Sequence, residues 1–307
     1  MARDTNPALT RWQLASSKLL DHYKVTSGEE FHLSSIHPDD TRDLSKEEAQ
    51  EWITQAIEMM SELQEKLYAQ DHWALLLIFQ AMDAAGKDGT IKKVMTGINP
   101  QGCQVFSFKT PSAEELDHDF LWRTSRDLPE RGRIGIFNRS YYEEVLIARV
   151  HPEILARQHL PDALVTKQIW KERFEDIAAF ERYLTRNGIA VRKFFLHVSK
   201  EEQTARLLKR LDTPSKNWKF SEGDFTEQEY WDAYLHAYEE MIRATSTPHA
   251  PWFVVPSDHK WFTHAVVAAA IIDALEELDL AFPTLNKEQT AKLRAIREKI
   301  AQRTAAS

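Results

Sequence analysis

The feature that most constrains this chain is a short apolar run that breaks into a turn of small residues and ends on Gly-Lys. It reads Leu75-Leu-Leu-Ile-Phe-Gln-Ala-Met-Asp-Ala-Ala-Gly-Lys-Asp-Gly-Thr90. A strand, a tight turn and a helix in this order point backbone N–H groups, the positive end of the helix and an ammonium at one spot. We expect this turn to bind phosphate, with Lys87 exposed at the helix start, through Ala84, Ala85, Gly86, Lys87, Asp88, Gly89 and Thr90.

The segment departs from the P-loop pattern G-x-x-x-x-G-K-[ST] at two positions. Ala81 stands where the pattern has its first glycine, and Asp88 stands where it has the hydroxyl that holds Mg²⁺. Asp83 and Asp88 would both lie within reach of a bound phosphate, so carboxylates could hold the metal instead of a hydroxyl. An ordinary strand-turn-helix without a ligand remains the alternative interpretation.

Composition and charge limit the class of protein. A chain of 307 residues that is 43% hydrophobic can bury one large α/β domain, with or without extensions. One cysteine, Cys103, excludes an internal disulfide and favours a reducing compartment. No apolar stretch is long enough to cross a bilayer, and a net charge of −8 argues against nucleic acid and anionic membranes as partners. We therefore expect a cytoplasmic protein.

Positive charge is nevertheless gathered in two places, which leaves a polyanionic substrate open. Lys92 and Lys93 follow the phosphate turn and join its candidate ligands. A second group of cations, at positions 206, 209, 210, 216 and 219, surrounds a polar segment. Acidic residues elsewhere would keep the protein soluble and leave one positive groove.

Capping boxes and apolar spacing predict alternating helices and strands, and thus a three-layer α/β/α fold with a five-stranded parallel sheet. We expect helices over 46–69, 112–126, 162–187, 261–280 and 287–303, and others opening at Ser199 and Thr226. The strands are expected from Leu75 and over 104–108, 133–137, 191–198 and 252–256. This predicts an N-terminal extension with a long helix (1–70), a catalytic domain (71–284) with a helical lid at about 206–225, and a C-terminal helix (285–307).

The end of the third strand carries a second polar motif, Phe137-Asn-Arg-Ser-Tyr-Tyr-Glu-Glu144. Ligands of parallel sheets bind beyond the carboxyl ends of the strands, so this motif should share an edge with the phosphate turn. Arg139 could grip a phosphoryl oxygen, and Glu143 or Glu144 could order a metal-bound water. Asn138 and Arg149 complete the candidates from this stretch. The alternative is a plain helix start with acidic first-turn residues.

The polar segment Leu211 to Asp224 is interpreted as a lid, because phosphoryl transfer needs charge neutralisation and exclusion of water. Its candidate phosphate ligands are Arg206, Arg210, Lys216 and Lys219. A solvated basic loop is the alternative. Trp218 would either anchor the loop in the core or stack on a nucleobase.

Three motifs together resemble the polyphosphate kinase 2 family over about residues 23–284: Met82-Asp-Ala-Ala-Gly-Lys-Asp-Gly-Thr90, Phe137-Asn-Arg-Ser-Tyr-Tyr-Glu143 and Lys216-Asn-Trp-Lys-Phe-Ser-Glu-Gly-Asp224. The resemblance implies a thymidylate-kinase-like fold and Mg²⁺-dependent transfer of the terminal phosphate of inorganic polyphosphate to a nucleotide. It implies Asp83 for metal or acceptor positioning, Lys87 and Arg139 for phosphate, and the arginines and lysines of the lid for closure.

Two departures bear on the subclass. Many relatives have Asp where Asn138 stands, and Asn where Glu143 stands. The form found here resembles class III, whose members use both AMP and ADP, and the metal would be held by Asp83 and Glu143. We expect a homo-oligomeric polyphosphate:AMP/ADP phosphotransferase that forms no covalent intermediate. An ATP-dependent nucleotide kinase and a non-catalytic nucleotide-binding regulator remain the alternatives.

Overall fold

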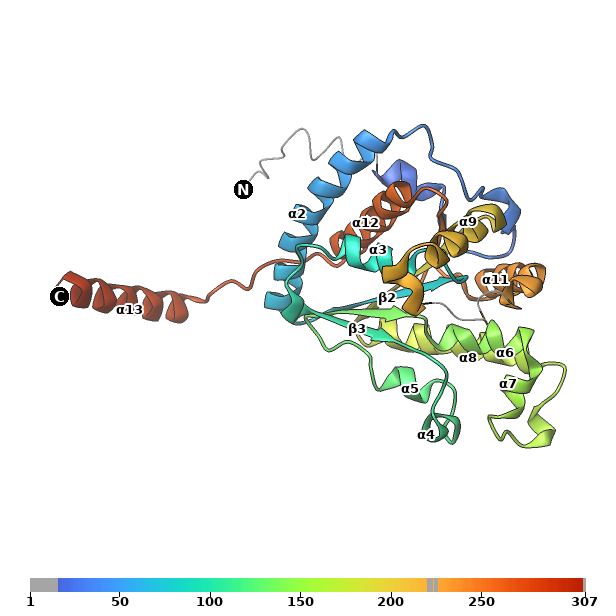
Figure 1. Cartoon of the computed structure of the whole chain (residues 1–307). Coiled ribbons are helices and arrows are strands. Elements are labelled where there is room, and N and C mark those ends of the chain that lie inside the picture. Colours follow the sequence, from blue (N-terminus) through green and yellow to red (C-terminus); the bar gives the residue numbers. More distant parts are fainter. Residues whose placement is uncertain (1–15, 220–222, 224–225, 306–307) are drawn as a thin grey trace.

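A parallel sheet forms the centre of the computed structural model, which describes residues 16–219, 223 and 226–305 (Figure 1). Within these residues the sheet has six strands in the order β1-β6-β5-β2-β4-β3. They are β1 Lys24–Val25, β2 Ala74–Ala81, β3 Cys103–Ser107, β4 Ile134–Asn138, β5 Ile189–His197 and β6 Trp252–Pro256. The five predicted strands are present and parallel. The prediction of a five-stranded sheet was wrong, because β1 adds an antiparallel edge strand, too short to show an alternating pattern.

The topology brings the two predicted motifs to one edge. β2 lies between β4 and β5 and pairs with both in parallel, with Phe79 opposite Asn138 and Ala81 opposite Leu196. From β2 the chain first visits β3 and β4 on one side, and then crosses to β5 and β6 on the other. The carboxyl end of β2 is therefore the point at which the strand order reverses, where ligands of open α/β sheets bind.

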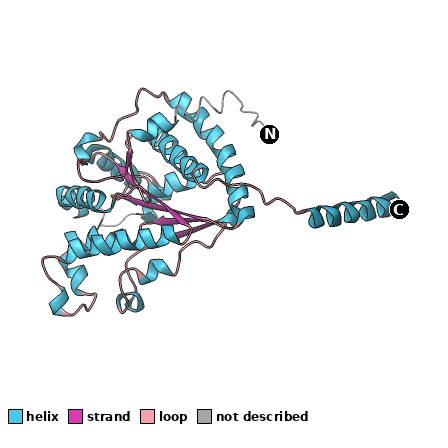
Figure 2. Cartoon of the chain, turned by 180° about the vertical axis from the view of Figure 1, so that it is seen from behind, coloured by secondary structure: helices cyan, strands magenta, loops and turns pink. Residues whose placement is uncertain are grey.

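Helices cover both faces of the sheet, which explains why every residue of β2 is buried. On one face lie α2 Lys46–Gln70, α3 Lys87–Val94 and α12 Lys260–Glu276 (Figure 1). On the other lies α8 Ile169–Arg186, beside which α11 Trp231–Thr245 packs (Figures 1 and 2). The remaining helices are α4 Ala113–Leu116, α5 Trp122–Ser125, α6 Ile147–Val150, α7 Pro152–Ala156, α9 Lys200–Leu211 and α13 Lys287–Ala305, with 3-10 helices η1 Leu33–Ser35, η2 Pro100–Gly102, η3 Tyr141–Val145, η4 Asp162–Leu164, η5 Pro214–Lys219 and η6 Glu227–Tyr230.

Three predicted helices differ from the structure, and in two of them a side chain competes for a backbone N–H group. The helix expected over 112–126 is broken into α4 and α5, and between them Asp119 Oδ1 accepts from Leu121 N at 3.0 Å. The helix expected from 162 begins at Ile169, after Thr166 Oγ1 accepts from Gln168 N at 3.1 Å. The helix expected to open at Thr226 forms without a side-chain cap there.

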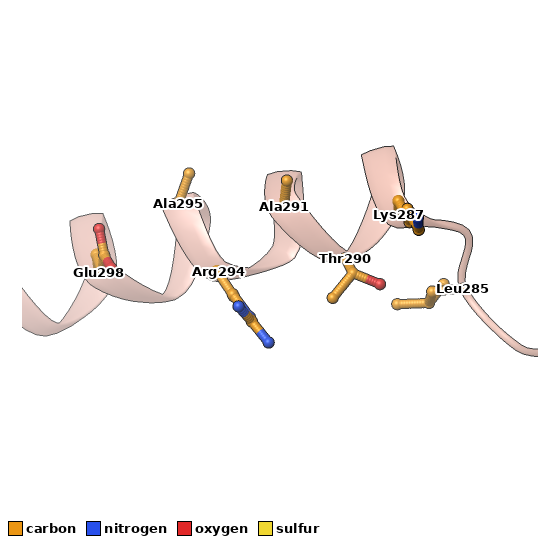
Figure 3. A pocket seen from close by; sticks show the side chains of 7 residues that line it. All are labelled: Leu285, Lys287, Thr290, Ala291, Arg294, Ala295 and Glu298. Atoms are coloured by element: carbon orange, nitrogen blue, oxygen red, sulfur yellow. The ribbon is translucent and has the colours of Figure 1, made fainter.

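Helix α13 extends away from the rest of the protein (Figures 1 and 2). Its apolar side chains Leu293, Ile296 and Ile300 are between 53% and 58% exposed. An open pocket lies along it, and Figure 3 shows that Thr290 and Arg294 lie on the side of Leu285. Among the described residues, no helix is long and apolar enough to cross a membrane.

Candidate functional site

The phosphate turn lies between β2 and α3 and is shaped by two residues with positive φ. Ala84 has φ +60° and Gly86, the N-cap of α3, has φ +109°. Glycine adopts this backbone conformation without strain, whereas alanine pays a steric penalty there. Thr90 N donates to Gly86 O at 2.9 Å, so the first turn of the helix is formed. The turn thus presents its N–H groups beyond the carboxyl end of β2.

Lys87 is buried, so the expectation of an exposed helix-start residue was wrong. Only 9% of the residue is exposed, and its Nζ donates to Ala81 O at 2.7 Å. The side chain folds back across the turn to the end of β2, and the sequence motif does not predict this side-chain conformation. Burial lowers the pKa of Lys87, assisted by Arg139 and opposed by Asp83, Glu143 and Asp88. Four charged side chains therefore lie close to this ammonium.

Arg139 lies directly after β4 and contacts two carboxylates. Its backbone has φ +66°, and its N–H donates to Phe79 O at 3.0 Å, which fixes the turn against β2. Arg139 Nη2 lies 2.9 Å from Asp83 Oδ1, and Nη1 lies 3.7 Å from Glu143 Oε2. Glu143 and Asp83 raise the pKa of Arg139 against the effect of burial, so the guanidinium is cationic.

Glu143 is nearly enclosed, since its side chain is 16% exposed. Burial raises the pKa of this carboxyl, and Arg139 and Lys87 oppose that rise. The amide of Gln80 donates to Glu143 Oε1 at 2.8 Å and accepts from Ser140. Gln80, which Ser140 orients, therefore fixes the Glu143 carboxyl, and the cations Arg139 and Lys87 favour its ionised form.

Asn138 and Asp88 join the two motifs directly. Asn138 Nδ2 donates to Asp88 Oδ1 at 2.8 Å, which ties the end of β4 to the first turn of α3. An aspartate at 138 would repel Asp88, whereas the amide pairs with it.

Arg206 lies inside the protein, which differs from the expected place on a lid. It is 9% exposed, and its guanidinium donates to Ala85 O at 2.6 Å, Ala84 O at 3.3 Å and Asp258 O at 3.0 Å. These bonds support the turn from behind and tie it to the loop after β6. Nη1 and Nη2 donate to backbone carbonyls and Nε donates to Glu202 Oε1 at 2.7 Å, so the geometry gives Arg206 a positioning role.

The other predicted cations are dispersed. Lys92 and Lys93 are exposed on α3, and Arg149 on α6 forms an ion pair with Glu240. Arg210 lies in the last turn of α9 and is half-buried. Lys216 and Lys219 belong to the 3-10 helix η5, within the stretch expected as a helical lid; the side chains of both, and residues 220–222, 224 and 225 of the lid, lie outside the described part. Trp218 is 78% exposed, so it does not anchor the lid in the core.

A cavity of about 60 Å³ connects the charged residues. Asp83, Arg139 and Glu143 line it together with Gln203, Glu227, Tyr234 and Tyr238, which the sequence analysis did not select. Gln203 Nε2 donates to Asp83 O at 2.9 Å. The helical spacing of Gln203 and Arg206 on α9, and of Tyr234 and Tyr238 on α11, was the available signal, because residues three and four apart share a helix face.

The same residues bear on a magnesium site. Among the described residues no group of three or more His, Cys, Asp or Glu side chains could hold a metal by itself. Asp83 and Glu143 face one cavity, and Mg²⁺ is usually held by one or two carboxylates with substrate phosphates and waters. Two carboxylates beside a phosphate turn therefore fit this ion.

Comparison with known proteins shows which family the chain belongs to. Residues 43–283 match the family described as Polyphosphate kinase 2 (PPK2). The chain is 52% identical over 257 residues to an ADP-polyphosphate phosphotransferase of Rhodopseudomonas palustris, which covers 83% of this chain and 89% of the relative. It is 42% identical over 263 residues to an AMP/ADP-polyphosphate phosphotransferase of Meiothermus ruber, which covers 85% and 94%.

A solved structure shares the fold as well. The crystal structure of Polyphosphate Kinase 2 from Arthrobacter aurescens TC1 superposes with a TM-score of 0.82 at 38% identity, over 92% of this chain and 96% of that one. The family match over residues 43–283 includes both motifs of the site. The chain therefore belongs to the polyphosphate kinase 2 family and is a phosphotransferase of the kinase type.

Proposed function

We propose that the protein transfers the terminal phosphate of inorganic polyphosphate to ADP and AMP, giving ATP and ADP. The observation that carries this proposal is the placement of Arg139 between Asp83 and Glu143, beside the phosphate turn. One phosphate can be held by the turn and Lys87 while Arg139 grips a second. The names of the relatives from R. palustris and M. ruber point to the same substrates.

The chemistry would be positioning and electrostatic stabilisation. The backbone N–H groups of the turn and the Lys87 ammonium orient the phosphoryl group and neutralise its charge, and Arg139 does the same from the acceptor side. Mg²⁺, when bound by Asp83 and Glu143, would neutralise further charge on the phosphate oxygens. Asp83 would also orient the acceptor. Transfer in line needs no covalent intermediate on the protein.

One set of incubations tests which phosphate donor the protein uses. Purified protein with Mg²⁺ and either ADP or AMP is given polyphosphate or ATP, and the products are separated. We expect ATP from ADP and ADP from AMP with polyphosphate as donor, and no product when Mg²⁺ is chelated. Transfer from ATP alone would support a nucleotide kinase instead, and binding without turnover would support a regulator.

Salt dependence tests whether polyphosphate lies along the lid. A long polyanion releases counterions when it binds cations, so its apparent affinity should fall with salt more steeply than that of AMP. The double substitution of Lys216 and Lys219 by alanine should make the apparent affinity for polyphosphate less dependent on salt. Equal slopes for both substrates would place the donor elsewhere.

We also propose that the protein is a cytoplasmic homo-oligomer. The single cysteine suits a reducing compartment, and the exposed apolar side chains of α13 suit burial against another surface. Light scattering after size-exclusion chromatography would measure the mass of the full chain. A monomeric mass at every concentration tested would contradict the oligomer.

A further inference from the structure

The cavity beside Arg139 has one wall that the transfer of phosphate does not use. Glu227 of η6 and Tyr234 of α11 form this wall, on elements other than those that carry Asp83 and Arg139. A volume of about 60 Å³ holds on the order of five water molecules. Any group that contacts Glu227 therefore lies only a few ångströms from the phosphate-binding residues.

Protein contacts fix the Glu227 carboxylate on one oxygen only. Tyr234 OH donates to Glu227 Oε2 at 2.6 Å, and His151 Nε2 lies 3.0 Å from the same oxygen. The His151 ring is itself held edge-on against Tyr230, with ring centroids 4.7 Å apart. Among the residues that the structure describes, none pairs with Oε1, and the side chain is 29% exposed. The carboxylate is thus oriented with one acceptor oxygen available.

The chemistry of that oxygen limits its partner. A carboxylate accepts hydrogen bonds and repels phosphate, so a phosphate held by Arg139 cannot also lie against Glu227. The partner must be a hydrogen-bond donor carried close to that phosphate. In a nucleotide the ribose hydroxyls are the donors nearest the phosphates, whereas the amino group of the base lies at the far end of the molecule.

We propose that Glu227 binds a ribose hydroxyl of the acceptor nucleotide and makes the enzyme select ribonucleotides over the deoxyribonucleotide that lacks this hydroxyl. Tyr234 and His151 are positioning residues that hold the carboxylate in place. This inference rests on the proposed function, because it assigns the sugar of the same acceptor. Hydrogen bonds to an ionised group are worth about 1.5–3 kcal/mol, so losing one should cost roughly tenfold or more in kcat/KM.

Steady-state kinetics with polyphosphate as donor test the assignment. The acceptors are ADP, 2′-deoxy-ADP, 3′-deoxy-ADP and IDP, which lacks the 6-amino group of the base. The wild type should use ADP at least about tenfold better than one of the two deoxy analogues. Glu227→Ala should bring that ratio close to one by lowering kcat/KM for ADP, and Tyr234→Phe should lower the ratio partway.

Glu229→Ala is the matched control, since Glu229 lies in the same 3-10 helix and is exposed; its ADP to deoxy-ADP ratio should equal that of the wild type. Thermal melting shows whether each variant folds, and Glu227→Gln replaces Glu227→Ala if the latter does not. A purely structural role would lower activity with all acceptors alike and leave the ratio unchanged.

Two results would overturn the proposal while leaving the proposed function intact. One is a wild type that uses ADP and both deoxy analogues equally well. The other is a Glu227 variant that alters the ADP to IDP ratio instead, which would assign the carboxylate to the base. A wild type that does not phosphorylate ADP when polyphosphate is the donor would instead contradict the proposed function itself.

Discussion

Residues 139–144 contribute to two charged clusters, one at the edge of the sheet and one inside the protein. At the edge, Arg139 and Glu143 meet Asp83. Inside, Tyr142 meets Glu181 of α8 and Lys193 of β5. The two clusters share a stretch of chain and differ in what satisfies their charges.

The interior cluster is saturated by the protein. Lys193 Nζ lies 2.6 Å from Glu181 Oε2 and donates to Thr245 O at 2.7 Å and to Tyr142 OH at 3.1 Å. Both tyrosines, Tyr141 and Tyr142, donate to the other oxygen of Glu181. Both charged side chains are at most 1% exposed, so every one of these partners is needed to offset desolvation.

The edge cluster leaves capacity for a ligand. The side chains of Arg139 and Asp83 are 36% and 33% exposed, and both line the cavity. A complete internal network fixes the backbone, while an incomplete one at the end of the strands can accept phosphate and metal. We propose that the interior cluster serves the fold and that the edge cluster serves the chemistry.

The largest effect should come from the interior cluster. Glu181→Gln leaves Lys193 buried without its counter-charge, which should lower the free energy of unfolding by about 3–5 kcal/mol. Urea unfolding measures it. Glu175→Gln, on the same helix in an exposed pair with Lys171, is the control and should have little effect. If Glu181→Gln were as stable as the control, the interior pair would not be structural.

Replacing Lys87 tests whether the edge cluster contributes to catalysis. Lys87→Ala should lower kcat by at least about a hundredfold, the scale seen when one transition-state donor is removed. Some loss of stability is expected because the side chain is buried, so the rate is compared at a temperature where melting shows both proteins folded. Lys171→Ala is the control. A folded Lys87→Ala variant with nearly normal kcat would refute the assignment.

His197 tests the interior by pH. Burial lowers the pKa of this side chain to about 4, and its Nδ1 has no hydrogen-bond partner among the residues that the structure describes. In the unfolded chain the His197 imidazole takes up a proton near pH 6.5, whereas in the folded chain it stays neutral down to about pH 4. The free energy of unfolding is therefore highest above pH 6.5 and falls as the pH is lowered toward 4. At pH 5 the loss should be about 2 kcal/mol.

The difference in unfolding free energy between pH 7.5 and pH 5 should shrink by that amount in His197→Gln. His264 shifts in the same direction and contributes to the wild-type loss, so only the comparison of variants isolates His197. His236→Gln, which alters an exposed histidine, should leave the difference unchanged. An equal change in both variants would argue against a neutral buried His197.

The smallest effect should separate the two acceptors. AMP lacks the second phosphate of ADP, so it depends more on a carboxylate that orders the metal near the acceptor. Glu143→Asn should therefore lower kcat/KM for AMP roughly tenfold more than for ADP, about 1.4 kcal/mol of difference. Measuring both acceptors with both proteins decides it. An unchanged AMP to ADP ratio would leave Glu143 with a structural role only.

Local sequence predicted the elements well where local interactions form them. The side chains of Ser45, Ser112 and Ser199 accept from the N–H groups of Glu48, Glu115 and Glu202, as the capping boxes indicate. The same pattern at Thr226 forms no cap. There the helix start is decided by the packing of α11, because Glu227 pairs with His151 and Tyr234.

What the sequence by itself determined is the phosphate turn, the placing of Arg139 and Glu143 at the end of a neighbouring strand, and the family. These follow from residues close together in the chain and from the rule that parallel strands present their carboxyl ends at one edge. Only the tertiary structure decided that Lys87 is buried, that Arg206 supports the turn from behind and that Glu227 faces the cavity. Arg206 and Ala84 are 122 residues apart, and no local pattern encodes which side chain fills the space behind a turn.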